Sequence, residues 1–118
     1  AHPLGALYNT HHGLTNAVIM PYVLEFNRKA IDERMTRLAR FLNLPNPGFA
    51  AVQKWILDLR TEIKIPHTLK EIGVDDKRVD EVAKMAEADP SAGGNPIKVG
   101  AKELGAIFVA GLNGTLAA

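Results

Sequence analysis

Apolar residues recur at helical spacing along most of this chain, and no segment shows the alternation of a strand. The densest apolar run covers residues 14–27, where apolar side chains would occupy nearly every side of a helix. This pattern predicts a buried helix, and Pro21 within it predicts a kink because proline lacks the backbone donor. Residues 30–42 form a second, amphipathic pattern. Its inward positions are Ile31, Met35, Leu38 and Leu42, and its outward ones are Arg34, Arg37 and Arg40.

A loop at residues 43–47 precedes the next helical pattern. Asn46 followed by Pro47 is typical of an N-cap and a first helical residue. We expect one buried face on this helix, made of Phe49, Val52, Trp55, Ile56, Leu59 and Ile63. Thr68 and Glu71 then have the spacing of a capping box, for a short helix that Gly73 closes.

The ends of the chain are also helical in pattern. Residues 1–8 resemble the tail of a helix, and a turn at Asn9 would leave Thr10 to cap the next helix. Asp75 or Asp76 is expected to cap a helix that carries Val79 and Val82. A loop at residues 90–96 precedes a last helix at residues 101–112. The sequence therefore predicts an all-α fold of six or seven helices, in one domain over residues 1–118.

Composition excludes several classes of function. The chain has 118 residues, 47% of them hydrophobic, which suffices for one core. A net charge of +1, with acidic and basic residues mixed, disfavours a nucleic-acid partner, and no run is long enough to span a membrane. Because there is no cysteine, any metal would need His, Asp or Glu ligands; the absence also fits a cytoplasmic location.

The candidate chemistry lies at the N-terminal end, where three of the four histidines precede the dense apolar run. The informative stretches are His2-Pro3-Leu4-Gly5-Ala6, His12-Gly13, Asn16-Ala17, Met20-Pro21-Tyr22-Val23 and Glu25-Phe26-Asn27. Together they resemble the iron-containing (group III) alcohol dehydrogenases. The resemblance is strongest over residues 1–28 and continues more loosely toward the C-terminus.

The resemblance implies that this chain is the all-helical C-terminal domain, a helical bundle, of an NAD(P)-dependent alcohol dehydrogenase. A missing N-terminal nucleotide-binding domain would be its partner, in a homo-oligomer that acts on small alcohols and aldehydes. His12 matches a ligand of the catalytic Fe²⁺ (or Zn²⁺). His2 matches a residue beside the metal and substrate that takes part in proton transfer or hydrogen bonding without being a permanent ligand. The family's other ligands would precede Ala1, which indicates a fragment of a longer protein.

The remaining polar candidates have plainer interpretations. His11 and His12 are adjacent, so their side chains would point about 100° apart on a helix, and His11 is expected to face solvent or support the site. His67 is expected to be a surface loop residue. Asn95-Pro96-Ile97 departs from the Asn-Pro-Arg more usual in the family, which removes any contact that an arginine would make.

Two alternatives stay open. One is another branch of the same superfamily, such as glycerol dehydrogenase, dehydroquinate synthase or maleylacetate reductase. The other is a helical interaction module without catalysis, which would have no polar cleft near His2 and His12. If the chain belongs to any of these metal-dependent enzymes, we expect residues 1–118 alone to bind no stoichiometric metal. We also expect the chain alone to associate through the surface around His2 and His12.

Overall fold

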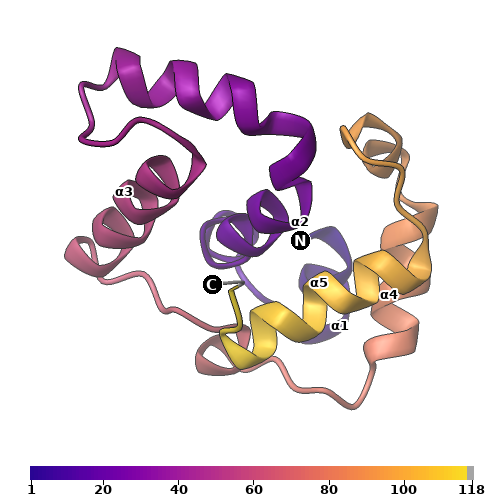
Figure 1. Ribbon diagram of the computed structural model, residues 1–118. Coiled ribbons are helices and arrows are strands. Elements are labelled where there is room, and N and C mark those ends of the chain that lie inside the picture. The colour runs from indigo at the N-terminus through magenta and orange to yellow at the C-terminus, as the bar shows by residue number, and fades with distance from the viewer. Residues whose placement is uncertain (117–118) are drawn as a thin grey trace.

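The structure, a computed structural model, describes residues 1–116, and regular structure in that range is entirely helical. Five α-helices and two 3₁₀ turns follow along the chain: α1 (His2–Tyr8), α2 (His12–Phe41), α3 (Phe49–Glu62), η1 (Leu69–Ile72), α4 (Val79–Ala88), η2 (Pro90–Gly94) and α5 (Ala101–Asn113). In Figure 1, α1, η1 and α5 lie against α2, α4 packs on α1 and α5, and α3 packs along α2. The all-α prediction is therefore confirmed.

The longest element corrects one detail of the prediction. Residues 14–27 and 30–42 are not separate helices but parts of the single 30-residue α2. The physical reason is that Arg28 and Lys29, which join them, are good helix formers and supply no break. Pro21 is fully buried, as expected, and α2 changes direction partway along its length (Figure 1).

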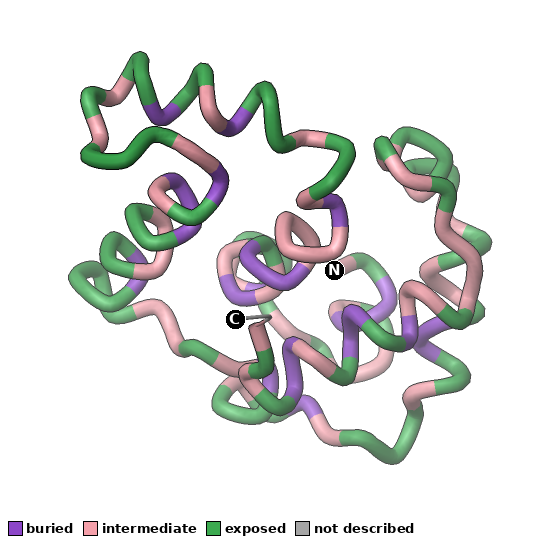
Figure 2. Tube along the Cα trace, in the orientation of Figure 1, coloured by how far each residue is buried: buried purple, intermediate pink, exposed green. Residues whose placement is uncertain are grey.

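Buried residues are coloured purple in Figure 2, and the buried apolar ones form two clusters. The larger joins the first half of α2 to α1, η1, α4 and α5, through Leu4, Val18, Leu69, Val74, Val82, Phe108 and Leu112. The smaller joins the second half of α2 to α3, through Met35, Ala39, Phe49 and Val52. Each such side chain contributes about 1.5–3 kcal/mol when fully buried, so the larger cluster fixes the N-terminal helices that carry His2 and His12.

The buried face of α3 differs from the predicted one. Trp55, expected in the core, is 44% exposed, and Leu59 and Ile63 are exposed with it. Gln53 and Arg60 are buried instead. The helix carries two apolar stripes, and the one through Phe49, Val52 and Ile56 meets α2. Likewise on α2, Leu38 is exposed and Ala39 is buried, because Ala39 lies closer to the contact with α3.

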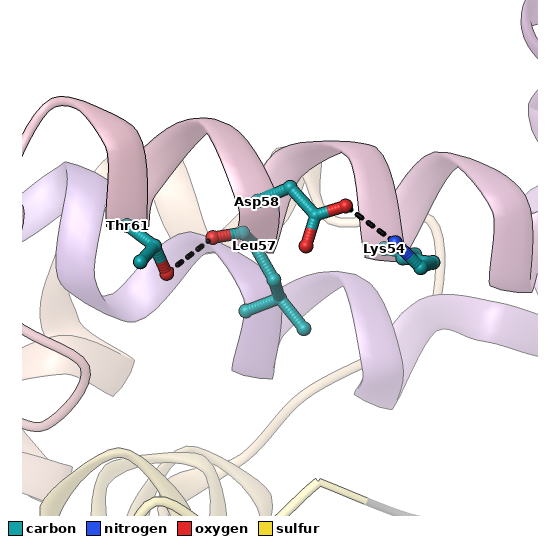
Figure 3. A network of polar contacts seen from close by, with 4 residues as sticks. All are labelled: Lys54, Leu57, Asp58 and Thr61. Atoms are coloured by element: carbon teal, nitrogen blue, oxygen red, sulfur yellow. Dashed lines mark hydrogen bonds and ion pairs between the residues drawn. The ribbon is translucent and has the colours of Figure 1, made fainter.

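The outer face of α3 is held by local polar contacts, shown in Figure 3. Lys54 Nζ lies 2.6 Å from Asp58 Oδ2, one helical turn away, and the Thr61 hydroxyl donates to the Leu57 carbonyl at 3.0 Å. Exposed pairs of this kind contribute only about 0.3–0.5 kcal/mol, so they support the helix without deciding its position.

The sequence predicted the presence of each helix more accurately than the residue at which it starts. The α3 helix begins after Gly48 rather than after Asn46, which adopts a left-handed φ of 51° in the loop. The α4 helix begins after Arg78, because Asp75 instead accepts hydrogen bonds from the Lys77 amide and the Tyr8 hydroxyl. The capping box of Thr68 and Glu71 and its closure at Gly73, with a φ of 88°, are confirmed.

Candidate functional site

His2 and His12, the two predicted site residues, line the same hollow. The hollow has a volume of about 450 Å³, and Asn16 and Asp89 also contribute to its wall. His2 is the first residue of α1 and His12 the first of α2, and both side chains are exposed. The structure thus brings together two histidines from separate helices, with a carboxylate beside them.

Two local features place the histidines there. Pro3 occupies the first turn of α1, where no carbonyl of the helix needs the amide hydrogen that proline lacks. After α1 the chain turns at Asn9, which has a left-handed φ of 55°. The turn returns the chain toward the start of α1, so that His12 begins the next helix near His2.

The start of α2 is fixed by His11 rather than by the predicted cap Thr10. His11 Nδ1 accepts a hydrogen bond from the Leu14 amide at 3.3 Å. The buried Thr15 hydroxyl hydrogen-bonds with Thr10 Oγ1 at 2.8 Å and with the His11 carbonyl at 2.9 Å. His11 is exposed, as expected, but its ring supports the helix, which leaves the neighbouring His12 available for chemistry.

Asp89 also lines the hollow, although no motif in the sequence singles it out. Its Oδ1 accepts hydrogen bonds from the Ser91 hydroxyl at 2.7 Å and from the Ser91 amide at 2.9 Å. The Ser91 side-chain and backbone hydrogen bonds hold the pKa of Asp89 below its ordinary value, and the charge of nearby His2 adds a smaller effect. The hollow therefore contains a carboxylate that stays ionised. The Asp-Pro-Ser run is typical only of a turn that a carboxylate caps.

Two asparagines connect α2 to the segment that follows η2, beside the hollow. The side-chain amides of Asn27 and Asn95 donate to each other's oxygen, both at 2.8 Å, across 68 positions of sequence. Asn95 Nδ2 also donates to the Ile97 carbonyl at 2.6 Å. Since Asn27 is only 4% exposed, these bonds hold the end of η2 against α2 and keep Ser91 at the rim.

The fourth histidine lies elsewhere. His67 is an exposed residue in the loop between α3 and η1, as predicted, but its ring is not free. Its Nδ1 lies 2.8 Å from Arg60 Nη2, and its carbonyl accepts a hydrogen bond from the Tyr22 hydroxyl at 2.6 Å. His67 therefore belongs to the packing of α3 against α2 and not to the hollow.

The donor set determines what the hollow can hold. An exposed imidazole such as that of His12 is a good ligand for Fe²⁺ or Zn²⁺. Within residues 1–116, however, no three His, Cys, Asp or Glu side chains come close enough together to hold a metal ion. The described residues thus fit as part of a ligand set.

None of the helices in this part of the chain has the length and apolar character needed to cross a membrane.

Comparison with known proteins identifies close relatives of this arrangement. The chain is 33% identical over 102 residues to the lactaldehyde reductase of Escherichia coli K12, an alignment that covers 81% of this chain and 27% of that protein. It is 34% identical over 114 residues to the 1,3-propanediol dehydrogenase of Citrobacter freundii, covering 92% of this chain and 30% of the relative. The chain therefore spans less than a third of the length of these relatives.

Solved structures give the same result for the fold. A crystal structure of 1,3-propanediol oxidoreductase superposes with a TM-score of 0.87 at 32% identity, covering 94% of this chain and 31% of that one. The maleylacetate reductase of Rhizobium sp. strain MTP-10005, at 22% identity and a TM-score of 0.76, shares the fold. Residues 1–112 match the family model described as "Fe-containing alcohol dehydrogenase family, C-terminal". The chain therefore belongs to the Fe-containing alcohol dehydrogenase family and corresponds to its C-terminal region.

Proposed function

We propose that this chain is the helical domain of a metal-dependent, NAD(P)-dependent alcohol dehydrogenase, which interconverts alcohols with aldehydes or ketones by hydride transfer. The observation that carries the proposal is that His2 and His12 line one hollow in a member of this family. Relatives more than three times as long leave room for a nucleotide-binding domain outside residues 1–118. That domain would hold the nicotinamide and supply the other metal ligands.

His12 would contribute one imidazole to the metal, Fe²⁺ or Zn²⁺. When bound, such a metal acts as a Lewis acid on the substrate oxygen. Support comes from the exposure of His12 and from the way His11 occupies the capping position beside it. The ring of His12 is thus placed at the hollow by the helix that it begins, and no backbone group competes for it in the hydrogen bonds described for residues 1–116.

His2 would hold or move a proton at the substrate oxygen. An imidazole titrates near neutral pH, which suits a group that must both accept and donate. Asp89 lines the same hollow, where its carboxylate is held by the Ser91 amide and hydroxyl, so His2 has a polar neighbour at the site.

The relatives favour alcohol chemistry over the alternatives. Those at 31–35% identity carry the names of alcohol, diol and hydroxy-acid dehydrogenases or aldehyde reductases, whereas the maleylacetate reductase shares only the fold. A non-catalytic helical module would not need exposed histidines and an ionised carboxylate around a common hollow.

We include in the proposal a cytoplasmic location, consistent with the absence of cysteine, and a homo-oligomer, consistent with the exposed Trp55, Leu59 and Ile63.

The test uses the intact protein that contains this chain. His12→Ala should lose most of the bound metal and most alcohol oxidation with NAD⁺ or NADP⁺, measured by elemental analysis and by coenzyme absorbance. His11→Asn is the matched control, because asparagine keeps a capping acceptor while removing the neighbouring imidazole. Its metal content and activity should stay close to those of the native protein. Full metal content and full activity in His12→Ala would remove His12 from the site.

A further inference from the structure

A second, apolar cavity, open on one side, adjoins the histidine hollow. Its volume is about 370 Å³, within the range of small-molecule sites. Helices α1, α2, α4 and α5, together with η2 and the segment after it, line the cavity, with walls that include Leu4, Val23, Val82, Val99, Ile107 and Phe108. None of the described side chains that line it is charged.

The cavity and the histidine hollow adjoin each other. The same residues line both: Ala1, Pro3, Ala86, Ser91, Ala92 and Leu104. The two spaces therefore share a wall that is formed by α1, η2 and small side chains of α4. One end of this combined site is polar, with two histidines and a carboxylate, and the other end is apolar.

The polar groups at the rim of the apolar cavity are already occupied. The Asn95 amide is paired with Asn27 and with the Ile97 carbonyl, and the Ser91 hydroxyl donates to Asp89. A substrate with a second hydroxyl or a charged group on its tail would lose water there and find few replacement partners. Burying such a group without a hydrogen-bond partner is unfavourable, whereas a hydrocarbon chain gives up no hydrogen bonds when it leaves water.

We propose that the apolar cavity binds the hydrocarbon chain of the substrate, so that the enzyme prefers monohydric alcohols with an unbranched apolar chain over ethanol and over diols. The proposal rests on the proposed function, which places the reacting oxygen at His2 and His12. Each methylene that enters the cavity should raise kcat/KM by about fourfold, until the chain reaches the far wall.

Val99 is the position at which to test it, because its side chain lines only the apolar cavity. In the intact protein, Val99→Phe should lower kcat/KM for 1-hexanol at least tenfold while leaving ethanol within about twofold. Val99→Ala, which enlarges the cavity, should extend the preference to longer alcohols. Val109→Phe makes the same change at an exposed position of α5 and should alter neither substrate.

Binding provides a readout that is independent of turnover. Titration calorimetry with 1-hexanol should show saturable binding to the native protein and to Val109→Phe, and its loss in Val99→Phe. If no alcohol is oxidised but hexanol binding follows this pattern, the proposed function fails and the cavity assignment stands. If alcohols are oxidised with no dependence on chain length, or if Val99→Phe affects ethanol and hexanol equally, the cavity assignment is wrong and the function stands.

Discussion

Arg60 of α3 donates a hydrogen bond to the carbonyl of Ala17 in α2, at 3.2 Å from Nη1. In a continuous helix the partner of that carbonyl would be the amide of residue 21, which is a proline and has no hydrogen to donate. The same nitrogen donates to the Val18 carbonyl at 2.7 Å, and Gln53 Nε2 donates to the Pro21 carbonyl at 2.7 Å. Two buried polar residues of α3 thus satisfy the backbone that Pro21 disturbs.

Removing the guanidinium should therefore destabilise the fold. Arg60→Met keeps much of the apolar stem but leaves the Ala17 carbonyl buried without a donor, a loss of about 1.5–3 kcal/mol for a charged hydrogen bond. Urea unfolding measures the change in the free energy of unfolding. Lys54→Met, an exposed cation on the same helix, is the control and should change stability by less than about 0.5 kcal/mol.

A double-mutant cycle isolates the role of Pro21. Pro21→Ala supplies an amide hydrogen for the Ala17 carbonyl, so Arg60→Met should cost about 1 kcal/mol less in that background. Equal losses in both backgrounds would show that Arg60 acts only by filling space between α2 and α3.

Lys64 offers a stabilising substitution. It follows the end of α3 in a left-handed conformation, with a φ of 63°, and the Ile65 amide donates to the Arg60 carbonyl at 2.8 Å. This conformation is unfavourable by about 1–2 kcal/mol for a residue with a Cβ, whereas glycine loses about 0.4–1 kcal/mol in chain entropy. Lys64→Gly should therefore raise the free energy of unfolding by roughly 0.5–1 kcal/mol. Lys54→Gly, inside α3, should lower it by about 1 kcal/mol, and a loss at both positions would contradict the argument.

Glu71 should make stability depend on pH in the acid range. Hydrogen bonds from the Thr68 amide, at 2.8 Å, and from the Thr68 hydroxyl hold its pKa below the ordinary value. Since the folded pKa is lowered, the stabilisation is present above the unfolded pKa and is lost as pH falls through the folded one. Glutamine keeps the capping geometry without titrating, so Glu71→Gln should flatten the decline of Tm below about pH 4.5. Glu33→Gln, on the exposed surface of α2, should leave the decline unchanged.

The sequence predicted helices well because a helix is a local pattern, but it did not show which face of α3 is buried. The helix has two apolar stripes, and the face that is buried also carries Gln53 and Arg60. Their burial is favourable because they donate hydrogen bonds to the carbonyls of Ala17 and Pro21, which lie in α2, more than thirty positions earlier in the sequence. That requirement exists only in the tertiary structure. The place of Asp89 in the site could not be predicted for a similar reason, since only the fold brings it to the hollow of His2 and His12.

His2 is predicted to affect turnover more than metal binding. In the intact protein, His2→Ala should lower kcat by about 10²–10⁴-fold and change the pH profile, because a positioned proton-transfer group would be lost. Metal content should stay near that of the native protein. If the rate and the pH profile are both unchanged, or if the metal is lost as in His12→Ala, the assigned role is wrong.

The last prediction concerns residues 1–118 prepared alone. A catalytic zinc-type site usually has three protein ligands, and the described part of this chain gathers no such group. His12 supplies one ligand at the hollow; His2 supplies at most a second, and the Asp89 carboxylate is engaged by Ser91. After dialysis against Fe²⁺ or Zn²⁺, elemental analysis should therefore find far less than one ion per chain, and no alcohol oxidation should be measurable with NAD⁺ or NADP⁺. Circular dichroism should nevertheless show a helical chain, since both buried clusters lie within residues 1–116. One ion per chain, lost in His12→Ala but kept in His11→Asn, would show that these residues form a complete site without the rest of the protein.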